Sequence, residues 1–131
     1  MPLETETGRR STVVLLWTIK GLLLPVFCFA IGGKLIPLQV MANNFERYGL
    51  GDQMTLLGVG ELVAFVLFMV PRTNSIGVLL LSAQMGGAIV THMQHGEMYW
   101  LQSAVLALVW TTGIIANPSL LGGLRPKVLP R

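Results

Sequence analysis

The sequence predicts an all-α integral membrane protein, a bundle of four transmembrane helices with both termini on the cytoplasmic side. Of its residues, 53% are hydrophobic and only 11% are charged, whereas a soluble domain carries about 25% charged residues. The apolar residues are also grouped into four runs, at about 13–36, 54–70, 76–93 and 98–116. Each run has about the length that crosses roughly 30 Å of hydrocarbon. A soluble core is disfavoured because almost no polar helix face is left to meet water.

This pattern predicts a single membrane domain at residues 12–117, between cytoplasmic tails at residues 1–11 and 118–131. There is no room for a separate soluble domain. The single cysteine, Cys28, lies inside the first run, so no intrachain disulfide and no thiolate metal site is expected. No basic stripe with interleaved aromatic residues indicates nucleic-acid binding.

The first span is predicted to be retained, since it is too long for a signal-peptide core and is followed by no clear cleavage site. Lys20 is expected to reach toward the head groups, and Pro25 to kink the helix. The longest loop follows at residues 37–53, and it is expected to hold a short interfacial helix at about residues 38–48.

The remaining spans are separated by short connections. After the second span, Asn74 or Ser75 is expected to cap the start of the third span with its side chain. Residues 94–97 make a very short link to the fourth span, whose first residues include Trp100, a typical interfacial anchor. Asn117 and Pro118 end that span.

Counting lysine and arginine in the connections gives the orientation. With the N-terminus inside, only Arg47 falls on the outer side. Six basic residues then lie inside: Arg9, Arg10, Arg72, Arg125, Lys127 and Arg131. The prediction is a multi-pass protein of the cytoplasmic membrane.

Glu61 is the most informative residue, because a charge inside an apolar span costs on the order of 3 kcal/mol or more at the bilayer centre. The topology places it roughly 10 Å below the outer start of its helix. Lys34 and His92 end their spans on the same side. Lys34 or His92 could therefore pair with Glu61 and lock the helix register, or Glu61 could relay protons or bind a ligand.

Small residues at helical spacing on the third span favour close packing there, and His92 follows Ala88 on that face. We therefore expect His92 to point inward. His92, His95 and Glu97 are too sparse a set to predict a metal site. The residues predicted to form a polar ligand site in the outer half are Lys34, Glu61, Phe65, Gln84, Met85, His92, Trp100 and Gln102.

Several short motifs resemble the DoxX and DoxX-like membrane proteins. They run in the family's order over about residues 30–92. They are Gly33-Lys34-Leu35, Phe45, Gly49, Gly58-x-Gly60-Glu61-Leu62, Pro71-Arg72, Gly77 and Met85-x-Gly87-Ala88-x-x-Thr91-His92. The resemblance implies a compact four-helix bundle in the cytoplasmic membrane, and Lys34, Glu61 and His92 match the family pattern.

The resemblance also suggests a function linked to quinones, because members were first associated with a membrane thiosulfate:quinone oxidoreductase and with redox or thiol-handling partners. No flavin, haem or iron–sulfur ligand set is evident in this sequence, so a partner subunit would hold any redox cofactor. The main hypothesis is an accessory subunit that binds a small, quinone-like lipophile. The small-residue stripe on the third span could equally form a homo-oligomer interface.

The alternative hypothesis is a small membrane enzyme of the isomerase or cyclase type. In that case Glu61 and His92 would be the catalytic acid–base pair acting on a lipophilic substrate. The sequence leaves open whether the protein catalyses a reaction.

Overall fold

The computed structural model describes residues 2–124 and is helical through most of that range. Three helices are long and apolar enough to cross a membrane, and a shorter apolar helix, Trp100–Ala116, follows them. The elements are α1 (Pro2–Leu35), α2 (Gln39–Arg47), η1 (Gly51–Gln53), α3 (Met54–Met69), α4 (Asn74–Gln94), α5 (Trp100–Ala116) and η2 (Pro118–Leu124). The predicted all-helical architecture is confirmed over the described residues, and three of the helices have the length and composition of membrane spans.

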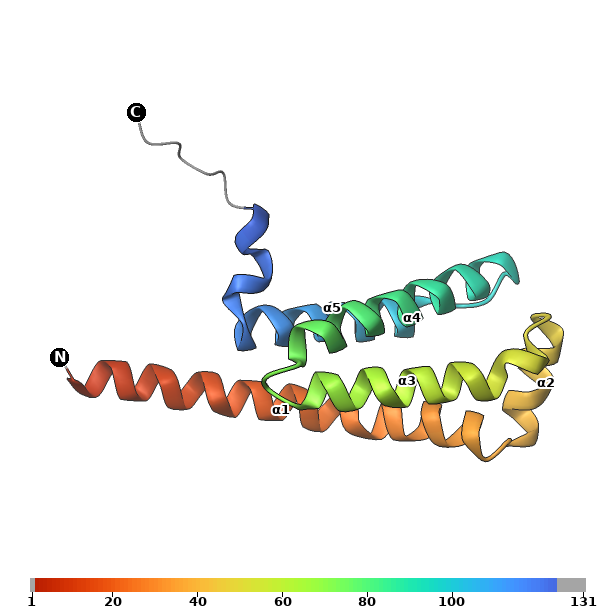
Figure 1. Ribbon diagram of the computed structural model, residues 1–131, viewed down its shortest axis with the longest axis horizontal. Coiled ribbons are helices and arrows are strands. Elements are labelled where there is room, and N and C mark those ends of the chain that lie inside the picture. The colour runs from red at the N-terminus through yellow and green to blue at the C-terminus, as the bar shows by residue number, and fades with distance from the viewer. Residues whose placement is uncertain (1, 125–131) are drawn as a thin grey trace.

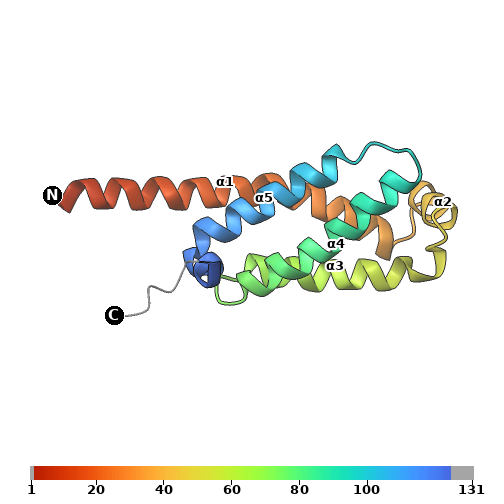
Figure 2. The ribbon, with the colours of Figure 1, turned by 90° about the horizontal axis from the view of Figure 1, so that it is seen from above.

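The four long helices alternate in direction around one bundle (Figure 1). α3 packs against α1 and α4, while α5 packs against α4 and α1. The short helix α2 lies at the end of the bundle where α1 stops and α3 begins, and η2 lies at the opposite end (Figures 1 and 2). A helix was predicted at about residues 38–48, and α2 is found there.

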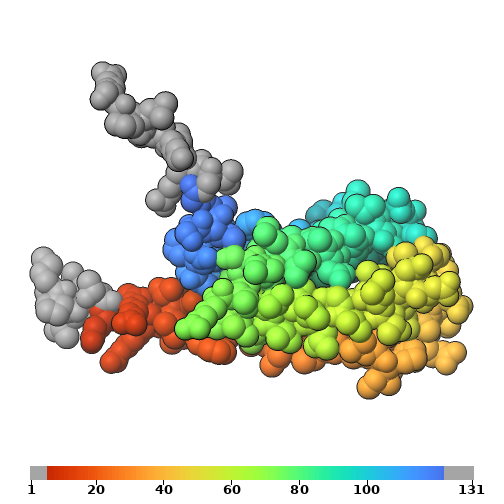
Figure 3. Space-filling view, in the orientation of Figure 1, coloured from red at the N-terminus to blue at the C-terminus, as the bar shows by residue number. Residues whose placement is uncertain are grey.

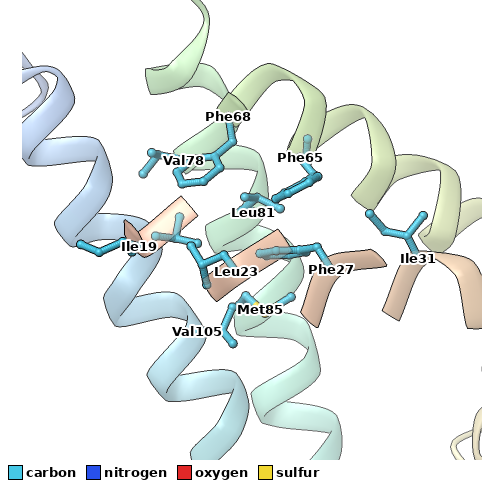
Figure 4. Close-up of a cluster of buried hydrophobic side chains, with 12 residues drawn as sticks. Ile19, Leu23, Phe27, Ile31, Phe65, Phe68, Val78, Leu81, Met85 and Val105 are labelled. Atoms are coloured by element: carbon cyan, nitrogen blue, oxygen red, sulfur yellow. The ribbon is translucent and has the colours of Figure 1, made fainter. Parts of the chain in front are cut away.

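The core forms where all four long helices converge, and Figure 4 shows their apolar side chains meeting there. Phe27 of α1 and Phe68 of α3 are among its largest fully buried side chains. The cluster comprises Ile19, Leu23, Phe27, Ile31, Ala64, Phe65, Phe68, Val78, Leu81, Met85, Val105 and Val109. Many apolar side chains on the opposite helix faces are exposed, as expected where lipid is the solvent.

The turn between α3 and α4 depends on a glycine. A Cβ atom at Gly77 would collide with the backbone of Phe68. Backbone atoms cannot move aside as the end of a flexible side chain can, so this position accepts only glycine. The close approach holds the start of α4 against the end of α3.

Side chains from this turn satisfy the last carbonyl groups of α3, which lack partners within the helix. Thr73 donates a hydrogen bond to the Leu67 carbonyl at 2.9 Å, and Asn74 donates one to the Phe68 carbonyl at 2.7 Å. The prediction that Asn74 or Ser75 caps the third span was wrong, because the N-cap residue of α4 is Thr73 and it makes no side-chain capping bond. Asn74 instead closes the preceding helix.

Lys20 performs a similar role from α1. Its ammonium group is 3.3 Å from the Met69 carbonyl at the end of α3, and the residue is only 7% exposed. A cation at a helix C-terminus is favoured by the helix dipole. Lys20 was expected to reach the head groups, but in the structure it is buried against α3.

The two ends of the chain extend beyond the predicted spans. α1 begins at Pro2, and its N-terminal part projects past the bundle (Figure 3). Residues 2–11, expected as a tail, therefore belong to a helix, and their described side chains from residue 6 onward are exposed. Of the predicted C-terminal tail, residues 118–124 form η2 and residues 125–131 lie outside the described residues. The division into tails and membrane domain stays a prediction.

Candidate functional site

A pocket of about 490 Å³ lies at the α2 end of the bundle. Its walls come from α1, α2, α3, α4 and α5, and they are mostly apolar. Pockets of this size and character hold small ligands when a few polar groups converge in them. Six of the eight predicted ligand-site residues line it: Lys34, Glu61, Gln84, Met85, His92 and Gln102.

Glu61 and Lys34 form an ion pair in the wall of the pocket. The Glu61 side chain is 2% exposed and the Lys34 side chain 16% exposed. Of the two partners considered for Glu61, the structure therefore gives it Lys34. Because both groups are withdrawn from water, their charges act on one another and on a ligand with little screening.

A glycine of α3 makes this ion pair sterically feasible. A Cβ atom at Gly58 would lie 2.9 Å from Cβ of Lys34, which is closer than such atoms approach one another. The absence of a side chain at Gly58 lets α1 approach α3 one turn before Glu61. The Gly58-x-Gly60-Glu61 motif thus couples the carboxylate to the close packing that brings it a cation.

A Cβ atom at Gly60 would lie 2.9 Å from Nε2 of Gln84 on α4, the end of a flexible side chain that could move aside. The same amide nitrogen donates a long hydrogen bond of 3.4 Å to the Leu57 carbonyl. Across the pocket, Oε1 of Gln102 is buried and has no hydrogen-bond partner among the described residues. Two side-chain amides therefore accompany the ion pair.

His92 belongs to a second polar group, at the end of the pocket that α2 covers. Its Nδ1 lies 2.8 Å from Glu97 Oε2. The same carboxylate accepts a hydrogen bond from the Tyr48 hydroxyl and forms an ion pair with Arg47. We call these four residues, Arg47, Tyr48, His92 and Glu97, the Glu97 cluster.

The predicted Lys34–Glu61–His92 site is therefore divided into two parts. All three residues line one pocket, but Glu61 is held by Lys34 and His92 by Glu97. The hydrogen bond considered between Glu61 and His92 is replaced by these two pairings. The physical reason is that Glu97, in the link between α4 and α5, offers His92 a closer carboxylate.

Two predicted residues do not line the pocket. Phe65 is 6% exposed in the core and stacks on Phe27, with ring centroids 4.7 Å apart. Since Phe27 lines the pocket, Phe65 supports the pocket from behind. Trp100 is 68% exposed and stacks on Tyr99 at the start of α5. It does not line the pocket with the other residues of the predicted site.

Sequence reasoning missed the residues of α2 and of the α4–α5 link. Tyr48 lines the pocket, and its ring lies 4.8 Å from that of His95. Arg47 and Glu97 carry opposite charges in two connections that the topology places on the same side. Their opposite charges are the sequence feature from which the Arg47–Glu97 pair could have been predicted.

The weakly supported metal set is not assembled. His95 Nδ1 lies 2.8 Å from the Thr91 carbonyl of its own helix. Over the part of the chain that the structure describes, no group of three histidine, cysteine, aspartate or glutamate side chains is placed to hold a metal ion.

The geometry offers a ligand both kinds of hydrogen-bonding partner. An ammonium donates to carbonyl or anionic oxygens, and a carboxylate accepts from hydroxyl or amine groups. The apolar remainder of the wall favours a ligand with a hydrophobic body.

A family model described as the DoxX-like family matches residues 18–115, a range that contains the whole pocket. No curated protein and no solved structure matches the chain.

Proposed function

Because the chain belongs to the DoxX-like family, a family of membrane proteins, we propose that it binds a small lipophilic molecule in the pocket at the α2 end. The observation that carries the proposal is the Lys34–Glu61 ion pair in the wall of an otherwise mostly apolar cavity. Ionisable residues inside a membrane span are costly and most often functional. The ligand would place its polar group on this pair and its apolar body against the remaining wall.

The proposed topology is four spans with both termini in the cytoplasm. α5 has 17 residues, which at about 1.5 Å per residue nearly spans the hydrocarbon. The alternating directions of the four helices support this arrangement. Arg9, Arg10 and Arg72 lie toward the η2 end, where the positive-inside rule would put the cytoplasm. The pocket would then open in the outer half of a cytoplasmic membrane.

A quinone is the ligand that we propose by analogy with the family. Its carbonyl oxygens would accept hydrogen bonds from Lys34, and the hydroxyls of its reduced form would donate to Glu61. A redox partner subunit and a homo-oligomer stay proposals, resting on that analogy and on the small-residue stripe of α4.

The acid–base alternative requires Glu61 and His92 to act on one substrate. Both line the pocket, but their separate partners, Lys34 and Glu97, hold them in two groups. The binding function needs no such cooperation and fits this geometry better.

The test is binding of a decyl-tailed benzoquinone to the protein in lipid nanodiscs, followed by quenching of tryptophan fluorescence. Lys34→Gln removes the ammonium, whereas Arg72→Gln removes a charge at the opposite end and serves as the matched control. A hydrogen bond to a charged group contributes about 1.5–3 kcal/mol, so we expect the Kd to rise at least about tenfold with Lys34→Gln. It should stay unchanged with Arg72→Gln.

Lys34→Arg keeps the charge, so partial recovery of binding separates a lost contact from a misfolded variant. Equal affinities for the wild type, Lys34→Gln and Arg72→Gln would refute the proposed site.

A further inference from the structure

We propose that the pocket is loaded sideways from the bilayer, between α1 and α5, and that its ligand is therefore an amphiphile whose apolar tail remains in the lipid. This inference rests on the proposed binding function and extends it to the route and the ligand class. It follows from the different construction of the two sides of the pocket.

The side toward water is closed by cross-linked polar groups. α2 lies at this end of the bundle (Figure 3), and its residue Phe45 and its C-cap residue Tyr48 line the pocket. The Glu97 cluster ties α2 to the α4–α5 link through an ion pair from Arg47 and a hydrogen bond from Tyr48. The Tyr48 hydrogen bond is partly buried and is strengthened by the charge of its acceptor, whereas the Arg47 side chain is 58% exposed and its ion pair contributes little. A ligand that entered through this end would have to part these contacts.

The side toward lipid has no such ties. Phe29 of α1 and Leu101 of α5 both line the pocket, yet they are 66% and 64% exposed on the outer surface. Each side chain thus borders both the cavity and the surrounding bilayer. Between residues 26–35 and residues 98–106, all of which the structure describes, no hydrogen bond or ion pair joins the two helices.

In Figure 1 the ribbons of α1 and α5 lie farther apart toward the α2 end, and in Figure 2 the two helices cross. Only apolar side chains would have to move at the proposed opening, and rotamer changes of exposed side chains are fast compared with the opening of helices.

The same geometry defines the ligand class. Hydrocarbon tails are as apolar as leucine side chains, so a tail gains little by leaving lipid for protein. The polar group is different, since the Lys34–Glu61 pair and the side-chain amides of Gln84 and Gln102 offer it partners inside the pocket. The pocket therefore suits a polar head group with a long tail that extends past Phe29 and Leu101.

The test attaches a bulky group to the proposed opening. In a Cys28→Ser background, which removes the only native cysteine, Phe29→Cys is labelled in detergent with a bulky maleimide and returned to nanodiscs. Leu22→Cys is the matched control. It lies two turns earlier on the same face of α1, is 63% exposed, and does not line the pocket. The probe is the decyl-tailed benzoquinone, followed by stopped-flow tryptophan quenching.

We expect the label at position 29 to slow association at least tenfold and the label at position 22 to change it less than twofold. Unlabelled Phe29→Cys should bind the probe at the same rate as the Cys28→Ser background, which controls for folding. Equal effects of the two labels would overturn the sideways route, as would faster association in Glu97→Gln, which loosens the water side. If Lys34→Gln also bound the probe as tightly as the wild type, the binding function itself would fall.

Discussion

Removing Lys34 should destabilise the fold more than neutralising Glu61, because the two partners are buried to different degrees. The Glu61 side chain is 2% exposed, whereas that of Lys34 is 16% exposed and lies in the last turn of α1. Without Lys34, the carboxylate has no other charged partner among residues 2–124. Without a charge on Glu61, the long lysine stem can turn its ammonium toward water at the α2 end.

The expected magnitudes follow from this asymmetry. Breaking a buried ion pair from one side costs about 3–5 kcal/mol, and we expect Lys34→Met to lose about that much. We expect Glu61→Gln to lose about half as much, since the remaining charge can be solvated. The double variant leaves no unpaired charge, so its loss should fall below the sum of the single losses by about 2 kcal/mol.

The assay is equilibrium unfolding of the four proteins in bicelles, with Arg72→Gln as a control for the removal of an exposed charge. The reasoning would be refuted if Lys34→Met were within about 0.5 kcal/mol of the wild type, the range of ordinary surface substitutions. Strictly additive single losses would refute it equally, because they would show that the two charges do not interact.

Two further predictions concern the junction of α3 and α4. Gly77→Ala should prevent native assembly, because its Cβ would meet the Phe68 backbone. Gly86→Ala on the same helix, where the described residues leave space, should be neutral or stabilising by up to about 1 kcal/mol. Thermal unfolding measures both variants, and equal stability of the two would contradict the packing described. Asn74→Ala should cost about 1–3 kcal/mol, because it leaves the Phe68 carbonyl unpaired in a buried site. Unfolding in bicelles measures this loss, and a native-like variant would show that the carbonyl finds another partner.

The helices could be predicted from the sequence because spans buried in a membrane are long apolar runs, separated by the polar, glycine and proline residues of the connections. The predicted second span starts at residue 54 and the fourth ends at residue 116, as α3 and α5 do. The start of α1 was missed for a physical reason. Hydropathy shows where a chain leaves the hydrocarbon, but a helix continues through polar residues as long as their backbone bonds are made.

Tertiary partners of buried polar groups were harder to predict. Lys20 and Met69 are 49 residues apart in sequence, and nothing local to Lys20 indicates that it caps α3. Asn74 has the side chain of an N-cap residue, and only the turn geometry directs it backward to Phe68. Local propensity identified a polar group that needed a partner but not the partner itself.

The candidate site was predicted in part. The cost of a charge inside a span identified Glu61, and topology limited its partners to Lys34 and His92. The structure selects Lys34, because Gly58 allows α1 to approach. His92 was assigned to the same group as Glu61, whereas the structure pairs it with Glu97 of the α4–α5 link. The sequence around His92 does not show that this link brings a carboxylate to it.

The most direct test of the account is native mass spectrometry of the protein extracted gently from its own membrane, compared with the Lys34→Gln variant prepared in the same way. The account predicts that the wild type retains a tailed lipophile and that the variant loses it. A wild-type protein without bound lipophile, or the same molecule at equal occupancy in both proteins, would contradict it.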